Sequence, residues 1–169
     1  MNNYICVGKI INTFGIKGEL KIVSDFEYKD RIFKKEFPVY VGELKIRELV
    51  NNHRVHKNYD LVLFKGYTNI NEVLKYKGNK IYIERNDLNL QDDEYLLSDL
   101  IGFKVYDNTL EIGIVIDYEK TPNNVLLKVK GEKTFYIPEY SDYIEEIDVE
   151  NKKIITKNGS DLIIWKLIF

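Results

Sequence analysis

The chain has 169 residues, of which 44% are hydrophobic and 31% are charged, and its formal net charge is −2. This balance excludes a disordered chain, and the length allows one domain or two small ones. The sequence contains no alanine, but it has 13 Tyr and 8 Phe. Because alanine favours helices, whereas aromatic and β-branched residues favour strands, this composition predicts a mostly β protein.

Charge is divided unevenly along the chain. Residues 1–90 contain 16 Lys and Arg against 11 Asp and Glu, a balance of +5, whereas residues 91–169 contain 9 against 16, a balance of −7. A basic half suits a polyanion, and an acidic half suits a basic protein or repels nucleic acid so that it approaches from one side. Chance segregation of solvated charge is the alternative interpretation.

The residue types that carry most chemistry are scarce. Cys6 is the only cysteine, so no intrachain disulfide is possible, and its place in a β run favours a structural thiol. The close pair His53 and His56 has no acid–base or metal-ligand spacing. No apolar run approaches the roughly 18 residues of a membrane span, and no signal segment follows Met1. We therefore expect a cytoplasmic protein with no catalytic residue, metal or cofactor.

The first element is VGKIINTFGIKGELKIV, residues 7–23, in which two alternating runs surround a turn with Gly15 and Gly18. Alternation predicts two strands, and the glycines predict either a tight turn or a loop that faces an anion. Lys9, Lys17 and Lys21 make this hairpin basic. A barrel hairpin with solubilising lysines is the simpler interpretation.

Residues 24–35 have no alternation and are expected to form a loop. Arg31, Lys34 and Lys35 interleave with aromatic residues there, which suits either contact with a phosphate backbone or a solvated loop. Further strands are expected at residues 38–41, 44–50, 59–64 and 80–84. One short helix is expected between Gly66 and Gly78, with Asn69 as its N-cap and Glu72 in a capping box.

Six short strands are expected in the second half, at residues 102–106, 111–118, 125–130, 133–137, 144–149 and 154–157. Gly102 begins the first of these strands, and Gly113 marks a bulge or a close approach within the second. The apolar end, residues 162–169, predicts a last strand on the core or, as the alternative, a tail that orders on a partner. We expect two small β-barrels, at residues 1–86 and 95–169, with a linker at residues 87–94.

Several segments in order resemble the ribosome maturation factor RimM family across the whole chain. They are the opening hairpin, then GYTNINEVLKYKGNKIYI, DEYLLSDLIGFKV, NVLLKV and YIPEYSDYIEEIDVENKKIIT. The resemblance implies a translation-factor-type β-barrel followed by a PRC-type barrel. It also implies a non-enzymatic assembly factor that binds the head of the immature small ribosomal subunit through a basic ribosomal protein and promotes maturation of small-subunit ribosomal RNA. We expect it to act as a monomer.

Two positions depart from the family pattern. Phe14 stands where the family usually has His, and Leu96 and Leu97 follow Tyr95 where the family commonly has a second tyrosine and an aromatic residue. The family's tyrosine pair is implicated in binding the ribosomal protein, so Tyr95 is carried over directly, whereas the leucines offer apolar area without a hydroxyl. The candidate residues for this contact are Tyr95, Leu96, Leu97, Asn123, Asn124 and Tyr136. The candidates for facing RNA are Lys9, Lys17, Lys21, Arg31, Lys34 and Lys35, and the structural glycines are Gly15, Gly18, Gly102 and Gly113.

Two other classes of function are alternatives. A plain RNA-binding protein would use Gly15–Gly18 as the GXXG clamp of a KH domain, but that clamp needs flanking helices, and strands are expected here. An enzyme on a β-barrel would need a nucleophile, base or metal constellation, and the sequence does not supply one.

Overall fold

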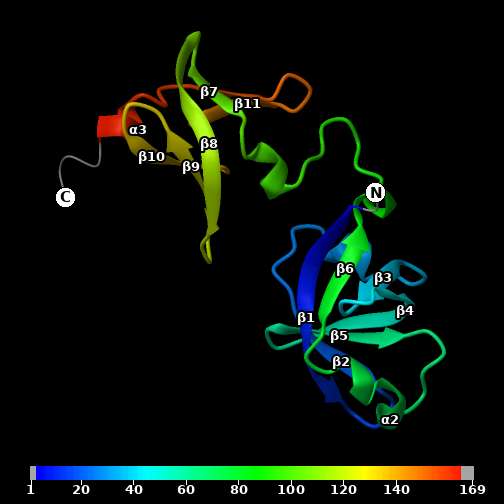
Figure 1. Ribbon diagram of the computed structural model, residues 1–169. Helices are drawn as coiled ribbons and strands as arrows, with labels where there is room; N and C mark the ends of the chain where they lie inside the picture. Colours follow the sequence, from blue (N-terminus) through cyan, green and yellow to red (C-terminus); the bar gives the residue numbers. More distant parts are fainter. Residues whose placement is uncertain (1–2, 165–169) are drawn as a thin grey trace. The chain divides into compact units, whose positions relative to one another are not determined.

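The computed structural model describes residues 3–164 and divides the chain into two compact units, residues 1–89 and 90–169 (Figure 1). Both units are built mainly of β-strands, as the composition predicts. Leu88 was expected in the linker, but it is only 1% exposed and closes the 3₁₀ turn η2, Arg85–Leu88. The first unit therefore extends beyond residue 86, because burial of this leucine ties the turn to the core.

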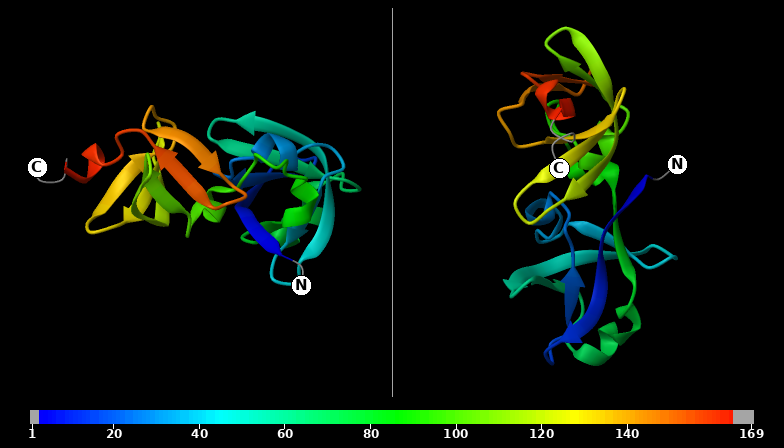
Figure 2. Two further views of the ribbon diagram at one scale, coloured as in Figure 1. Left: turned by 90° about the horizontal axis from the view of Figure 1, so that it is seen from above. Right: turned by 90° about the vertical axis from the view of Figure 1, so that its left-hand side faces the viewer.

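The first unit is a closed six-stranded barrel in the order β1-β2-β5-β4-β3-β6, with antiparallel pairing throughout (Figure 2). Its interior is filled by alternate residues of each strand, such as Ile81 and Ile83, both 0% exposed. The strands are β1 Tyr4–Phe14, β2 Glu19–Val23, β3 Pro38–Val41, β4 Ile46–His56, β5 Tyr59–Phe64 and β6 Lys80–Glu84.

The short helix expected in this unit is α2, Ile70–Val73, continued by the 3₁₀ turn η1, Leu74–Tyr76. Asn69 is its N-cap, because the Asn69 side chain accepts a 2.9 Å hydrogen bond from the Asn71 amide. A second helical turn, α1, Lys29–Ile32, lies in the segment that was expected to be a loop. Burial of Ile32 and Phe33, which are 0% and 3% exposed, stabilises this turn. The sequence did not predict it, because charged residues of both signs surround these two apolar residues.

The second unit is a six-stranded sheet in the order β10-β9-β8-β7-β12-β11. Most neighbours are antiparallel, and β12 pairs with β7 in parallel. Its core includes Leu97, Phe103, Leu127 and Phe135. The strands are β7 Lys104–Asp107, β8 Leu110–Lys120, β9 Val125–Lys130, β10 Thr134–Pro138, β11 Ile144–Asp148 and β12 Lys153–Thr156, and the 3₁₀ turn η3, Leu97–Leu100, precedes them.

The apolar end was expected to form a strand. Its described part instead lies in the helical turn α3, Asp161–Ile164, where Leu162 and Ile163 pack against the core of the second unit. Residues 165–169 lie outside the described part of the chain. Cys6 is exposed on β1 rather than buried. Strand alternation explains this, because Val7, its neighbour, points into the barrel with 3% exposure.

Candidate functional site

The turn between β1 and β2 is held against the start of α2. Gly15 and Gly18 have φ values of +67° and +87°, and a Cβ on Gly18 would lie 2.9 Å from the carbonyl oxygen of Asn69. The amide of Ile70 donates a 3.0 Å hydrogen bond to the carbonyl of Ile16, so the turn is anchored, while Lys17 stays exposed. Strands flank this turn on both sides, so it lacks the two helices of a KH clamp.

Phe14, at the end of β1, lies close to two side chains of β4. Its ring centroid lies 5.1 Å from that of His56 and 5.5 Å from the guanidinium carbon of Arg54. Arg54 also donates two hydrogen bonds of 2.8 Å to Glu19, which holds the pKa of the Glu19 carboxyl below its ordinary value. The Arg54 charge is therefore already partly neutralised at this end of the barrel.

Lys9 and Lys21 lie on the outer face of the β1–β2 pair. Lys9 is exposed and lies opposite Val23 on one side and Lys80 on the other. The ammonium of Lys21 lies 3.8 Å from the ring centroid of Tyr59, a cation–π contact on the neighbouring strand β5. Both lysines remain accessible to an anionic partner, although Lys21 is half-buried.

The other three basic candidates lie in or just after α1. The Arg31 guanidinium donates a 3.1 Å hydrogen bond to the carbonyl of Leu88 and lies 4.9 Å from the ring of Tyr28, so this side chain ties α1 to the end of the unit. Lys34 and Lys35 are exposed. Arg31 thus has a structural contact that accounts for its position.

The structure does not gather the six basic candidates into one patch. Lys17 lies beside α2, which adjoins the end of β1, whereas Arg31 contacts Leu88, which follows the end of β6. Because β1 and β6 are antiparallel, these points lie at opposite ends of the barrel (Figure 1). The sequence could not reveal this separation, since it depends on strand direction and not on spacing.

In the second unit, the hydroxyl of Tyr95 donates a 2.7 Å hydrogen bond to Oε1 of Glu139, a residue that is 6% exposed. The amide of Glu139 donates to the carbonyl of Val125 at 2.8 Å, and the amide of Val125 donates to Oδ1 of Asn124 at 2.8 Å. These contacts place Tyr95 next to the loop between β8 and β9.

Tyr136 belongs to the same part of the second unit. Its hydroxyl donates a 3.0 Å hydrogen bond to Oε1 of Glu119, which lies opposite Leu126 across β8 and β9. Asn123, at the tip of the intervening loop, is exposed. Four of the six candidates therefore lie around one end of the β8–β9 hairpin, namely Tyr95, Asn123, Asn124 and Tyr136. Glu119 and Glu139 were not among the sequence-based candidates, although the acidic balance of this half pointed to carboxylates.

Leu96 and Leu97 were expected to offer apolar contact area, and this expectation is wrong. They are 2% and 6% exposed, and Leu97 belongs to the core of the second unit together with Leu100. In a 3₁₀ turn, residues three apart lie on the same side, so η3 directs Leu97 and Leu100 inward together. The Asp99 carboxylate accepts a 2.9 Å hydrogen bond from the Leu96 amide and fixes this turn.

The remaining candidate glycines lie at irregular backbone positions. Gly102 has a φ of +91° just before β7. Gly113 adjoins the β7–β8 bulge, where a Cβ would lie 2.8 Å from the carbonyl oxygen of Lys130. Within residues 3–164, no group of His, Cys, Asp and Glu side chains is arranged to hold a metal ion. No helix in that same range has the length and apolar character to cross a bilayer.

Two family models match the chain in the order of its two units. The RimM N-terminal domain matches residues 5–88, and the RimM PRC barrel domain matches residues 97–162. The chain belongs to the RimM family. The two units are accordingly a RimM N-terminal domain and a RimM PRC barrel domain, and the break in charge near residue 90 falls between them.

Curated relatives support this assignment. The chain is 42% identical over 153 residues to the ribosome maturation factor RimM of Staphylococcus haemolyticus strain JCSC1435, covering 88% of this chain and 92% of the relative. It is 41% identical over 154 residues to that of Staphylococcus aureus strain bovine RF122/ET3-1, with the same coverage. A crystal structure of a 16S ribosomal RNA processing protein RimM from Pseudomonas aeruginosa matches with a TM-score of 0.48 and 21% identity, covering 94% of this chain and 99% of that one.

Proposed function

We propose that this chain is a non-enzymatic assembly factor of the small ribosomal subunit. It binds the head of the immature subunit through a basic ribosomal protein, contacts small-subunit ribosomal RNA and promotes maturation of that RNA. It acts in the cytoplasm as a monomer, and its binding energy favours one arrangement of the subunit head over misfolded ones.

The observation that carries this proposal is the match of both RimM domains, in order, to one chain. Relatives about 40% identical over most of their length bear the name ribosome maturation factor. The division of charge is consistent with two different partners, since the first unit suits a polyanion and the second suits a basic protein.

The end of the β8–β9 hairpin is the proposed contact for the ribosomal protein. Tyr95 and Tyr136 are half-buried, and each hydroxyl is held by a carboxylate, that of Glu139 or Glu119. Held aromatic side chains lose little conformational entropy on binding, and carboxylates complement a basic partner. Leu96 and Leu97 are not part of this proposed contact.

Co-sedimentation with purified immature and mature small subunits, at low and high salt, tests the proposal. Preferential binding to the immature subunit is expected, with affinity falling as salt rises because phosphate contacts release counterions. Equal binding to both subunits, or binding to neither, would contradict the proposal.

Paired variants separate the two contacts. Reversal of charge at Lys17 together with Lys34 should weaken binding in a salt-dependent way, whereas Tyr136→Ala should weaken it with little salt dependence. Reversal at Lys133 together with Lys157 changes the net charge equally within the acidic unit and is the matched control. Unchanged binding in both test variants would show that the assigned surfaces are wrong.

The enzyme alternative predicts turnover of the RNA or of a small molecule by the purified chain. A direct check incubates the chain with precursor small-subunit RNA alone. We expect the RNA to remain intact. Cleavage or modification of the RNA by an activity that co-purifies with the chain would favour an enzyme.

A further inference from the structure

Three tyrosines lie on one outer face of the first barrel, away from the β1–β2 turn. Tyr40 on β3 lies opposite Tyr82 on β6, and Tyr4 on β1 lies opposite Glu84 on β6. Alternation along β6 directs Ile81 and Ile83 into the core, so Tyr82 points outward with Tyr40. The tyrosine face is defined here as Tyr4, Tyr40 and Tyr82.

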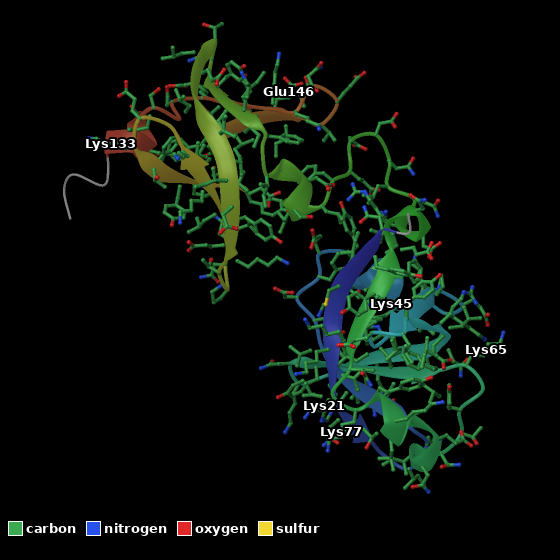
Figure 3. The ribbon with its side chains drawn as sticks, in the orientation of Figure 1. Lys21, Lys45, Lys65, Lys77, Lys133 and Glu146 are labelled. Atoms are coloured by element: carbon green, nitrogen blue, oxygen red, sulfur yellow. The ribbon has the colours of Figure 1, made fainter. Side chains whose placement is uncertain are left out.

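The rings of the tyrosine face lie close together. The centroids of Tyr4 and Tyr40 are 5.0 Å apart at an interplanar angle of 65°. The ammonium of Lys45, from the turn between β3 and β4, lies 3.5 Å from the centroid of Tyr82 and 5.7 Å from that of Tyr4. Figure 3 shows Lys45 beside β3 and β6, whereas Lys21 lies beside β1 and β2. All three tyrosines are half-buried, so each presents part of its ring to solvent.

Hydrogen bonds fix the orientation of Tyr40. Its hydroxyl is hydrogen-bonded to Glu84 and Arg47, and burial, followed by the contact with Glu84, raises the pKa of this phenol. The ammonium of Lys45 also donates a 3.2 Å hydrogen bond to the carbonyl of Gly42 and covers one face of the Tyr82 ring. A base that stacks on that face of Tyr82 therefore has to displace the ammonium to the side.

The charge around the tyrosine face favours an anion. Lys9 and Lys80 lie opposite each other, and the carbonyl of Lys80 accepts a hydrogen bond from the amide of Gly42, which begins the turn that carries Lys45. Arg47 lies opposite Tyr40 on β4. Two carboxylates adjoin Arg47. One is Glu84, and the other is Asp87, whose pKa is raised by burial and then by the negative charge of Glu84. Four cations thus lie around the face with the carboxylates of Glu84 and Asp87, and the exposed Glu43, in the turn that carries Lys45, is a third carboxylate.

Aromatic rings flanked by cations on a sheet are the chemistry that binds single-stranded nucleic acid. Successive bases stack on the rings and the cations pair with phosphates, whereas a duplex keeps its bases stacked inside. A neutral or basic protein partner would gain from the rings but not from the surplus of positive charge.

We propose that the tyrosine face binds unpaired RNA bases by stacking, with Lys45 and Arg47 beside the bases and Lys9 and Lys80 on the phosphates. This inference deepens the proposed function, and it rests on that function for the identity of the RNA as ribosomal. Among the residues it uses, Lys9 alone was a sequence-based candidate for facing RNA.

The first test measures binding of a fluorescein-labelled 12-nucleotide single-stranded RNA, and of the corresponding duplex, by fluorescence anisotropy. Tyr82→Leu should weaken single-strand binding about tenfold or more, because base stacking on an aromatic ring contributes on that scale. Tyr82→Phe keeps the ring, so its affinity for single-stranded RNA should stay within about twofold of that of the wild type.

Tyr106→Leu is the matched control, since Tyr106 is a half-buried strand tyrosine of the second unit with Lys153 5.8 Å from its ring. Equal affinity of the wild type and Tyr82→Leu, or tighter binding of the duplex than of the single strand, would overturn the proposal.

A second test uses the unaltered chain, so it does not depend on a variant that folds. Cys6 is the only cysteine, is exposed and lies opposite Tyr82 on the same face. Saturating single-stranded RNA should slow alkylation of Cys6 by N-ethylmaleimide severalfold, and the duplex should leave the rate unchanged. An unchanged rate with bound single strand would overturn the proposal. Protection by isolated ribosomal proteins but not by RNA would also overturn it and assign the face to a protein.

These tests fail separately from those of the proposed function. If the chain binds single-stranded RNA through Tyr82 but does not sediment with small subunits, the inference stands and the assembly role falls. If it sediments with immature subunits while Cys6 stays unprotected and Tyr82→Leu binds RNA normally, the assembly role stands and the tyrosine face is rejected.

Discussion

The hydroxyl of Tyr95 donates a 2.7 Å hydrogen bond to the carboxylate of Glu139, across 44 positions of sequence. Glu139 is only 6% exposed, and Tyr95 packs against the core of the second unit. This pair joins the segment that opens the second unit to the residue that follows β10. The Tyr95 side chain, which is proposed to contact a partner, therefore also stabilises the fold of the second unit.

Tyr95→Phe should destabilise the second unit by about 1.5–3 kcal/mol, because hydrogen bonds to charged groups are stronger than the average and removal of the hydroxyl takes a partner from a buried carboxylate. Hydrogen exchange of β9 and β10, measured by mass spectrometry, reports on this unit separately from the first. Glu139→Gln keeps an acceptor for the hydroxyl and should cost less. A larger cost for Glu139→Gln than for Tyr95→Phe would contradict this account.

Asp60 in the first barrel is 2% exposed, and its carboxylate lies 3.0 Å from the ammonium of Lys29 and 2.8 Å from Nε2 of His53. Asp60→Asn keeps the shape but removes the charge, so we expect the free energy of unfolding to fall by about 1–3 kcal/mol. Urea denaturation followed by circular dichroism measures the change, with exchange in β5 assigning it to the first unit.

The matched control for Asp60 is the exposed pair Lys65 and Glu36, whose side chains are 56% and 49% exposed and also 3.0 Å apart. Glu36→Gln should change the free energy of unfolding by less than about 1 kcal/mol, because solvent screens exposed ion pairs. Equal costs for Asp60→Asn and Glu36→Gln would show that burial does not determine the strength of the Asp60 contacts.

Gly18→Ala should destabilise the first unit more than Gly15→Ala. Both positions have positive φ, but a Cβ on Gly18 would lie 2.9 Å from the Asn69 carbonyl, whereas a Cβ on Gly15 would have its nearest neighbour at 3.9 Å. The shared backbone strain costs about 1 kcal/mol, and the extra clash adds roughly 1–2 kcal/mol at Gly18. Thermal unfolding of the two variants compares them directly, and equal midpoints would contradict the clash.

Asp107 should make the second unit sensitive to acid. Ser160 donates hydrogen bonds to its carboxylate from the hydroxyl and, at 3.1 Å, from the amide, and these bonds hold the pKa of Asp107 below its ordinary value of 3.8. Because the folded pKa is lowered, this stabilisation is present above that value and is lost as pH falls through the folded pKa. The difference in melting temperature between the wild type and Asp107→Asn should be largest near neutral pH and should shrink below pH 3.8.

Ser160→Ala tests the same contact from the donor side. Ser160→Ala should lower the melting temperature by part of the amount that Asp107→Asn does, with the same dependence on pH. The double variant should have a melting temperature only slightly below that of Asp107→Asn, because the two residues share one interaction. Additive losses in the double variant, or a difference from the wild type that does not vary with pH, would show that other groups govern the acid sensitivity.

Local patterns predicted many elements of the chain correctly. Residues 38–41, 59–64 and 125–130 form strands over the expected ranges, and Asn69 caps the expected helix. These features depend on alternation, turn residues and caps, all of which act within a few positions. The resemblance to the RimM family, which several segments in order carry, could also be predicted from the sequence, and both domain matches confirm it.

The candidate sites were less predictable, because exposure depends on which face a neighbouring element covers. Leu96 and Leu97 replace aromatic residues in the family pattern, yet a 3₁₀ turn buries Leu97 in the core, and Leu96 is only 2% exposed. Similarly, α1 depends on the burial of Ile32 and Phe33 in the first unit, which no local sequence pattern reveals.

By itself, the sequence determined the β-rich class, the division into a basic and an acidic half, and the family. Tertiary structure alone decided which side chains meet. The parallel pairing of β12 with β7 and the closure of β3 on β6 join segments about 40 to 50 residues apart. Such pairings set which residues share a face. They separated Lys17 from Arg31 and brought Tyr4, Tyr40 and Tyr82 together. The sequence alone could not show this, because strand register over long sequence distances is fixed only when the sheet forms.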